Sequence, residues 1–294
     1  MADILITGGA GSIGRALVQI LSAEGHAVRV MDLPSCDFAF AEELPGVQVV
    51  RGDILDRALL SAAAAGVDVV LHLAALLPPL SERDRQATWR VNVEGTRALI
   101  AALREGGGRG HLVLSSSVCV YGDTSAGDHP PISTEHPCAP FDVYGESKVA
   151  AEEAVRESGL PFTILRISGV SVPAFLAPPD VWPFRADQRI EFVARDDVVA
   201  ALAACVDNDK VIGRTLHVAG GATWRMLGQE YVARFNEVMG LDVQDAVYCP
   251  GPCAFDWYET TEAQQTLAYQ KTTFAAFLQQ LEAAIEEALG SSSS

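Results

Sequence analysis

The chain has 294 residues, 49% of them hydrophobic, which suffices for a sizeable core in one or two domains. A formal net charge of −17 disfavours nucleic acid and anionic membranes as partners, because phosphate groups bind to basic surfaces. No apolar run reaches the roughly 18 residues of a membrane-spanning helix. No basic segment precedes the apolar residues after Met1, so we expect a cytoplasmic protein without a signal peptide.

Short apolar runs alternate with longer alanine-rich segments over the first two-thirds of the chain. Such alternation is typical of an α/β fold, a doubly wound parallel sheet covered by helices on both faces. We expect strands at Asp3–Thr7, Ala27–Met31, Val47–Val50, Val67–Leu73, Gly110–Ser115 and Pro161–Ile167. We expect helices near Ser12–Ala23, Arg57–Ala65, Asp84–Arg104 and Val143–Glu157, and one more helix and strand at Phe192–Val206 and Thr215–Ala219.

The composition changes after Gly169. Residues 171–191 hold four prolines and little periodicity, which is typical of a loop-rich insertion over an active site. Residues 225–290 form a smaller helical part that closes with the amphipathic stretch Thr273–Leu289. We therefore expect a sheet domain over 1–169 and 192–220, a small C-terminal substrate lobe over 170–191 and 221–290, and a disordered tail over 291–294.

A glycine-rich segment joins the first strand to the first helix. Gly8, Gly11 and Gly14 allow a tight turn, close approach of backbone amides to a pyrophosphate, and close packing of the helix on the strand. Asp32 ends the second strand, where a carboxylate hydrogen-bonds a ribose 2′-hydroxyl and repels a 2′-phosphate. The pattern predicts a Rossmann-type NAD site in the sheet domain. Three arginines would favour NADP instead if they lay beside the ribose: Arg15, Arg29 and Arg51.

Two tyrosines stand in identical Val-Tyr-Gly tripeptides, and one of them has the neighbours of an acid–base catalyst. The pKa of a phenol is about 10, so a tyrosine that exchanges protons near neutrality needs a cation beside it. Lys148 follows Tyr144 by four residues, which places both on one helix face, and Asp142 is a suitable N-cap. Tyr121 has Ser125 at the same spacing, in a loop-like segment. We assign Tyr144 as the catalyst and Tyr121 as a wall of the substrate site.

Several motifs in the same order resemble the extended branch of the short-chain dehydrogenases/reductases, which includes sugar epimerases, dehydratases and dehydrogenases. The resemblance covers almost the whole chain. It rests on the glycine loop at 7–14, Gly52-Asp53-Ile54, His72-Leu73-Ala74-Ala75, Asn92 in Val-Asn-Val-Glu-Gly-Thr, the serine motif at 115–122, the Tyr144–Lys148 pair, and Phe192-Val-Ala-Arg-Asp-Asp-Val.

The resemblance implies a role for each of these residues. Ser117 would hydrogen-bond the substrate oxygen, Tyr144 would pass the proton, and Lys148 would hold the nicotinamide ribose and lower the pKa of the tyrosine. Asn92 would relay protons, or only brace a helix, and Ser117 has the alternative of capping the next turn. The expected NAD contacts are Gly8, Gly11, Ser12, Ile13, Gly14, Asp32, Asp53, Ile54, Leu73, Ala74, Ala75, Tyr144, Lys148 and Ile167. The expected substrate contacts are Ser116, Ser117, Tyr121, Ser168 and Arg185.

Two departures from the nucleotide-sugar members bear on the substrate. Ser168 stands where those members have an asparagine, and only about 28 residues separate it from Asp196, which leaves little room for a pocket that holds a nucleotide base. In having such a short segment, the chain resembles the sugar-acid dehydrogenases of the same branch. An anionic substrate would need a cluster of arginines, and two readings stay open for Arg185, Arg189 and Arg195. They bind a carboxylate or phosphate, or they pair with Asp180, Asp187 and Asp196 on the surface.

The predicted function is an NAD-dependent oxidoreductase that transfers hydride between nicotinamide and a carbinol or carbonyl of a sugar-like or sugar-acid substrate. An epimerase or dehydratase with tightly bound NAD is one alternative, and a non-catalytic NAD-binding regulatory protein is another. The resemblance also implies a homodimer, paired through the helices at Asp84–Arg104 and Val143–Glu157. Small apolar residues suit that pairing: Ala98, Ala101, Ala102, Val149 and Ala150. No metal site is expected, because the closest cysteines, Cys249 and Cys253, lack a second ligand group.

Overall fold

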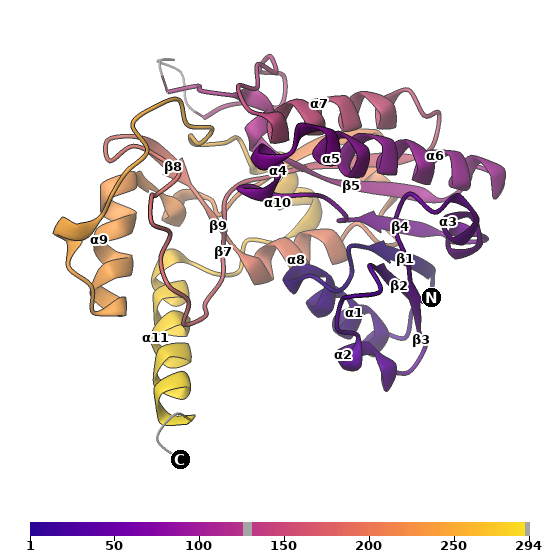
Figure 1. The fold of residues 1–294 in the computed structure, drawn as a ribbon, viewed down its shortest axis with the longest axis horizontal. Coiled ribbons are helices and arrows are strands. Elements are labelled where there is room, and N and C mark those ends of the chain that lie inside the picture. Colours follow the sequence, from indigo (N-terminus) through magenta and orange to yellow (C-terminus); the bar gives the residue numbers. More distant parts are fainter. Residues whose placement is uncertain (126–130, 292–294) are drawn as a thin grey trace.

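The structure, a computed structural model, describes residues 1–125 and 131–291. Its centre is a seven-stranded parallel sheet in the order β10-β6-β5-β4-β1-β2-β3 (Figure 1). The order reverses between β1 and β4, and the carboxyl ends of strands at such a point form the crevice in which open α/β sheets bind ligands. The strands are β1 (Asp3–Thr7), β2 (Ala27–Asp32), β3 (Val47–Arg51), β4 (Val69–His72), β5 (His111–Ser117), β6 (Phe162–Ile167) and β10 (Arg214–Val218).

Helices cover both faces of the sheet, as Figure 1 shows. Side chains alternate between the two faces along a strand, so Ile4 and Ile6 of β1 join one core while Leu5 joins the other. The first core is covered by α1 (Ser12–Ala23), α2 (Ala39–Glu42) and α8 (Arg195–Ala203). The second is covered by α3 (Arg57–Ala64), α6 (Gly95–Glu105) and α7 (Val143–Arg156). The prediction of a Rossmann-type α/β fold is confirmed.

The single helix predicted over Asp84–Arg104 is three consecutive segments. A short helix, α4 (Leu80–Arg83), precedes them; then come α5 (Arg85–Trp89), the π-helical turn η1 (Arg90–Glu94) and α6. The Asp84 carboxylate accepts a hydrogen bond from the Ala87 amide at 2.9 Å and starts α5. A π-helical turn differs from an α turn in which backbone groups pair, i→i+5 rather than i→i+4, and residue types do not specify that pairing. This turn carries Asn92.

A smaller part of the chain, at the left of Figure 1, has its own aromatic core, including Trp182, Phe184, Tyr231 and Phe274. It contains the antiparallel pair β8 (Arg189–Glu191) and β11 (Arg225–Leu227), together with α9 (Gly228–Met239) and α11 (Phe274–Ser291). The parallel pair β7 (Val170–Ser171) and β9 (Val193–Ala194) connects it to the sheet. Short helices complete the chain: η2 (Val118–Tyr121), η3 (Asp209–Val211), η4 (Ala222–Trp224), η5 (Val243–Asp245) and α10 (Thr261–Leu267).

Three observations bear on the expected organisation of the chain. The segment Phe192–Val206, predicted as a helix, begins with the strand β9 before α8 starts at Arg195. Within the part expected as substrate lobe, α10 returns to the sheet, because Ala263, Leu267 and Tyr269 join the first core. Ser291, expected in a disordered tail, ends α11, and the other three tail residues lie outside the described residues.

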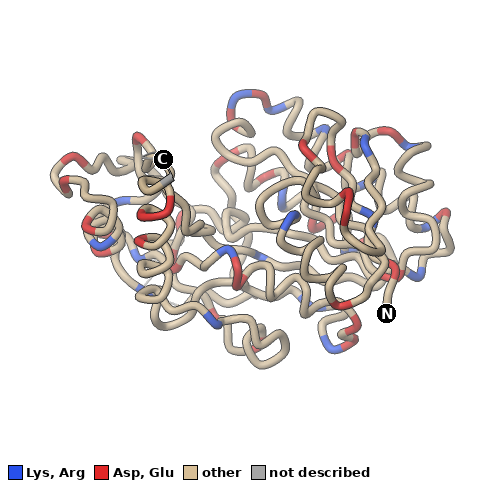
Figure 2. Tube along the Cα trace, turned by 90° about the horizontal axis from the view of Figure 1, so that it is seen from below, with Lys and Arg blue, Asp and Glu red and all other residues tan. Residues whose placement is uncertain are grey.

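Basic and acidic residues are dispersed along the chain, as Figure 2 shows. Within residues 1–125 and 131–291, none of the helices combines the length and apolar character needed to cross a bilayer. Of the residues predicted for a dimer interface, Ala101 is exposed. Ala102 is not on an outer face: it is 4% exposed and packs in the second core with Leu99 and Leu103. Residues three positions apart on a helix share a face, so Ala102 follows Leu99 inward.

Candidate active site

Two adjoining cavities, of about 310 and 210 Å³, lie at the carboxyl ends of β1, β4 and β5. Both are lined by Gly8, Gly11 and Leu73, so they form one groove that crosses the switch point of the sheet. All fourteen predicted NAD contacts line it. Asp32, Asp53, Ile54 and Ala74 line the first cavity; Ser12, Ile13, Gly14, Tyr144, Lys148 and Ile167 line the second; Gly8, Gly11, Leu73 and Ala75 line both.

The glycine loop fits a pyrophosphate. A Cβ on Gly8, whose φ is +72°, would lie 2.6 Å from the backbone nitrogen of Ala74, and one on Gly14 would lie 2.5 Å from the Cα of Gly9. Larger residues would therefore push the loop away from the sheet or from α1. No side chain caps α1 at Gly11, so its first amides have no intrahelical partner and are available to an anion.

Asp32 is held against the glycine loop. Its carboxylate accepts hydrogen bonds from the amides of Ala10 at 3.0 Å and Leu33 at 2.8 Å, and it lines the first cavity. The three arginines that would favour NADP are all bound to other groups. Arg15 pairs with Asp37, Arg29 donates to the carbonyls of Ala63 and Ala65, and Arg51 pairs with Glu42. This arrangement fits a ribose with a free 2′-hydroxyl.

The first two turns of α7 bring the catalytic candidates into the second cavity. Asp142 caps the helix through the Gly145 amide at 2.7 Å. Tyr144 lines this cavity together with Ser117, which stands at the end of β5. Lys148 is buried, donates from Nζ to the Ser115 carbonyl at 2.8 Å, and lies 5.6 Å from the Tyr144 ring centroid. Ser117 also accepts from the Cys119 amide, so it caps the next turn as well.

Asn92 braces the loop after β4 against α7. Its side chain accepts from the Leu76 amide at 2.7 Å and donates to the Leu76 carbonyl at 3.1 Å and to Ser147 Oγ at 2.9 Å. These contacts account for a structural role, and π-helical turns such as the one that carries Asn92 are frequent at functional sites.

Burial dominates the protonation of the catalytic candidates. It raises the pKa of the Tyr144 hydroxyl, and the hydrogen bond with Ser117 opposes that rise. Burial thus acts against the lowering of the tyrosine pKa that the resemblance implies, because an apolar environment disfavours the phenolate. Burial also lowers the pKa of Lys148 to about 8, while the charge of Glu152 raises it.

Three of the predicted substrate residues have their polar groups bound elsewhere. Tyr121 is 2% exposed, donates to His217 Nε2 at 2.5 Å and accepts from Arg166 Nη1 at 2.7 Å. It lines neither cavity, because it packs in a separate buried cluster with Ile132, Ala219 and Tyr258. Ser116 and Ser168 line the second cavity, but the Ser116 hydroxyl donates to Glu152 and that of Ser168 to the Glu191 carbonyl.

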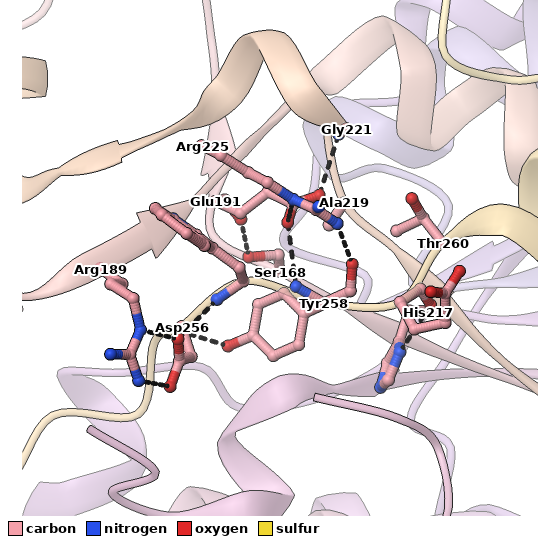
Figure 3. Close-up of polar contacts among 12 residues, drawn as sticks. Ser168, Arg189, Glu191, His217, Ala219, Gly221, Arg225, Asp256, Tyr258 and Thr260 are labelled. Carbon is pink, nitrogen blue, oxygen red and sulfur yellow. Dashed lines mark hydrogen bonds and ion pairs between the residues drawn. The ribbon is translucent and has the colours of Figure 1, made fainter. Parts of the chain in front are cut away.

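The arginines near the insertion do not converge on one point. Arg185 lines neither cavity; it contacts Asp123, Ser125 and Asp187. Arg189 pairs with Asp256 at 2.7 Å and Arg225 with Glu191 at 2.8 Å, and both carboxylates are fully buried. Figure 3 shows the two pairs. Arg195 pairs with Asp196. The reading of paired arginines is thus favoured, with Asp256 in place of Asp180 as the partner of Arg189.

Sequence reasoning missed Glu82, which lies beside the catalytic helix. Its carboxylate accepts hydrogen bonds from the amides of Val143 and Tyr144, both at 3.0 Å. Negative charge at a helix N-terminus is stabilising, so Glu82 helps to place Tyr144. Glu82 comes from α4, 62 residues before Tyr144, and no local pattern connects the two.

The model of the NAD dependent epimerase/dehydratase family matches residues 4–180, more than half of the chain. The chain belongs to this family. A crystal structure of a short-chain dehydrogenase/reductase superfamily protein from Agrobacterium tumefaciens, with bound NAD, superposes with a TM-score of 0.81 at 24% identity and 99% coverage of both chains. That match shows the shared fold. The predicted resemblance is confirmed, as is NAD as the cofactor at the level of the family.

Two curated relatives of this chain are named dehydrogenases. The chain is 34% identical to a 3-beta-hydroxysteroid dehydrogenase of Mycolicibacterium neoaurum, over 58% of this chain and 48% of the relative. It is 32% identical to D-erythronate dehydrogenase of Cupriavidus necator, over 58% of this chain and 56% of the relative. The chain spans about half the length of the curated relatives it matches. These names support the prediction of an enzyme.

Proposed function

We propose that this chain is an NAD-dependent oxidoreductase that transfers hydride between nicotinamide and a carbinol or carbonyl carbon of a sugar-like or sugar-acid substrate. One observation supports this reaction above all: Ser117, Tyr144 and Lys148 line the same cavity, inside the groove that suits a dinucleotide. Bound NAD supplies the hydride acceptor or donor. The division into an NAD-binding sheet domain and a substrate lobe, with the boundaries given above, is part of the same proposal.

Each residue of the site has its own role in the proposed reaction. In oxidation, the phenolate form of Tyr144 takes the proton of the substrate alcohol; in reduction, the hydroxyl donates its proton to the carbonyl oxygen and becomes the phenolate beside the charge of Lys148. Ser117 hydrogen-bonds the same substrate oxygen. Lys148 holds the ribose and carries a positive charge beside Tyr144, and Asn92 keeps the wall of the groove in place. Asp32 binds the adenosine ribose at the other end of the groove.

The substrate class rests on two supports. The segment between Ser168 and Asp196 is short, and one relative is named a D-erythronate dehydrogenase. A second candidate is an apolar secondary alcohol. It is favoured by the apolar wall of the second cavity, where Leu73, Leu77, Ile167 and Val170 lie beside the serines, and by the relative named a 3-beta-hydroxysteroid dehydrogenase.

A substrate screen tests the reaction. Sugar acids, sugars and hydroxysteroids are each incubated with NAD, and NADH is followed by absorbance. Net NADH formation with any of them, abolished by Tyr144→Phe, supports the dehydrogenase, and the class that reacts identifies the substrate. Interconversion of sugar epimers without net NADH indicates the epimerase alternative. Tight NAD binding without turnover of any substrate indicates the regulatory alternative.

We further propose a cytoplasmic homodimer. The six cysteines are all free thiols, which suits a reducing compartment, and α6 and α7 lie side by side on one face of the sheet with Ala101 exposed. Small residues on neighbouring helices allow close approach of a second copy.

A further inference from the structure

Three charged side chains lie in a row behind the catalytic candidates. Lys148 and Glu152 are one turn apart on α7, and Arg166 extends from β6 to meet Glu152. The three are 4%, 0% and 3% exposed. Burying a charge costs folding free energy unless the charge is paired. The partners of these three side chains therefore determine whether each of them stays charged.

The Glu152 carboxylate is held from several sides. It accepts from Ser116 Oγ at 2.5 Å and from Arg166 Nε and Nη2 at 3.0 and 2.8 Å. Arg156 adds a contact at 2.8 Å from the surface side. Two-pronged pairing of this kind fixes the orientation of the carboxylate as well as its charge. Burial acts to raise the pKa of Glu152, but the bonds and charge of Arg166, together with Ser116 and Arg156, leave that pKa lowered.

The other titratable groups that face Lys148 carry no negative charge near neutral pH. Burial raises the pKa of Cys119 to about 12, raises that of Tyr144, and lowers that of His72 to about 3. Glu152 therefore supplies the negative charge beside Lys148. Without it, two cations would share one buried site. An arginine does not lose its proton in proteins, whereas a buried lysine readily does.

We propose that Glu152 is a positioning residue that keeps Lys148 protonated, and that Arg166 limits the strength of this effect by competing for the same carboxylate. The consequence for catalysis rests on the proposed function, in which a charged Lys148 assists Tyr144. The charge state of Lys148 itself is measurable without substrate or cofactor. Failure of the inference and failure of the proposed function are thus distinguishable.

The chain suits a direct titration, because its three lysines are Lys148, Lys210 and Lys271. The protein is labelled with 13C at lysine Cε, and its carbon shifts are followed by NMR from pH 6 to 11. Lys210 and Lys271 are exposed, so Lys210→Arg and Lys271→Arg assign the three signals. In the wild-type chain we expect a midpoint of about 8 for Lys148.

Two variants with opposite effects carry the test. Glu152→Gln keeps a polar side chain but removes the charge, and we expect the Lys148 midpoint to fall by about 1–3 pH units. Arg166→Gln releases Glu152 toward Lys148, so the midpoint should rise. A role in packing alone would not move the two midpoints in opposite directions. Glu153→Gln is the matched control: Glu153 is the exposed neighbour on α7, and its loss should leave the midpoint unchanged.

An unchanged Lys148 midpoint in Glu152→Gln would overturn the inference. If Glu152→Gln does not fold, Arg166→Gln decides: an upward shift supports the inference and no shift overturns it. Once a substrate is known, Glu152→Gln should also move the alkaline limb of the kcat/KM profile downward by the same number of pH units as the Lys148 midpoint. A shift of the Lys148 midpoint without a shift of the alkaline limb would support the inference and contradict the proposed role of Lys148 in catalysis.

Discussion

Tyr144 and Tyr121 share the same flanking residues, yet their side chains have different surroundings. Tyr144 lines the groove beside Ser117. The hydroxyl of Tyr121 lies between Arg166 and His217. Because His217 Nδ1 faces the Glu259 carbonyl, which only accepts, Nε2 is the acceptor for Tyr121. Tyr121 is therefore a structural link, and the two tyrosines should respond differently to loss of the hydroxyl.

Tyr144→Phe should lower kcat by ~10²–10⁴-fold, the usual effect of removing a positioned acid–base group. NADH affinity should change little, because Lys148 and Asp32 remain. Tyr121→Phe should leave kcat within about tenfold but lower the free energy of unfolding by ~1–3 kcal/mol, since it leaves buried partners unsatisfied. Steady-state kinetics and urea denaturation separate the two effects. A larger loss of kcat in Tyr121→Phe would reverse the assignment.

Asp32 should set the choice of cofactor. We expect NADH to bind at least tenfold more tightly than NADPH, because the carboxylate repels a 2′-phosphate and the three nearby arginines are bound elsewhere. Fluorescence titration with both reduced cofactors measures this directly. Asp32→Asn should narrow the difference, whereas Asp53→Asn, at the adenine side of the same cavity, should preserve it. Equal affinity in the wild-type chain would mean that Asp32 does not contact the ribose.

At the scale of the element, the N-terminus of α7 determines where the catalytic side chains lie. Two carboxylates from different parts of the chain, Asp142 and Glu82, bind its first amides. Tyr144 is the second residue of this helix, so fraying of the first turn would displace it before it displaced Lys148. Both stability and turnover should therefore depend on these caps.

Asp142→Ala should lower the free energy of unfolding by about 0.5–2 kcal/mol, as the loss of an N-cap usually does, and should also reduce kcat. Asp56→Ala is the matched control, because Asp56 caps α3 through the Leu59 amide at 3.1 Å, away from the groove. We expect a similar loss of stability there and an unchanged kcat. Equal effects on kcat would show that the α7 cap acts only through global stability.

At the scale of the whole molecule, buried histidines should make the fold sensitive to acid. Burial lowers the pKa of His72 from 6.5 to about 3 and that of His217 to about 4. His72 lies between Thr7 and Thr96, and His217 between Tyr121 and the Glu259 carbonyl. Both are neutral in the fold, whereas in the unfolded chain they bind protons below about pH 6.5.

The unfolded state thus binds more protons between pH 6.5 and the folded pKa values. Stability is complete above pH 6.5 and falls below it by up to about 1.4 kcal/mol per pH unit for each histidine, until the folded form is protonated too, near pH 4 for His217 and near pH 3 for His72. Urea denaturation at pH 4.5 to 7.5 measures the slope. His217→Gln should reduce it, and His136→Gln, at an exposed position, should not. A flat profile in the wild-type chain would contradict the buried neutral state.

The proposed homodimer predicts a mass of twice 31.2 kDa by light scattering at micromolar concentration. Ala101→Glu, on the exposed face of α6, should shift the protein to the monomer by placing charge between the helices. Ala283→Glu, equally exposed on α11, serves as the control and should leave the mass unchanged. A wild-type monomer would exclude pairing through α6 and α7 at that concentration.

Much of the groove could be predicted from short stretches of sequence. The apolar periodicity places β1, α1 and α7 within a residue or two of their observed bounds, and Gly8 and Gly14 are where the backbone admits no Cβ. The spacing of Tyr144 and Lys148 put both on one helix face, since four residues make about one turn. The π-helical turn around Asn92 escaped prediction, because it depends on which backbone groups pair and not on residue type.

The sequence by itself determined the sheet, the glycine loop and the pairing of Tyr144 with Lys148 on one helix face, because each depends on contacts within a strand, a turn or a helix. Only the tertiary structure decided which charges meet. Arg189 pairs with Asp256, and Arg166 pairs with Glu152. Tyr121 hydrogen-bonds His217, which lies 96 residues further along the chain. Pairs between distant residues form where strands and helices come together in space, and spacing along the chain does not encode that meeting. The partners of buried charges therefore follow from packing.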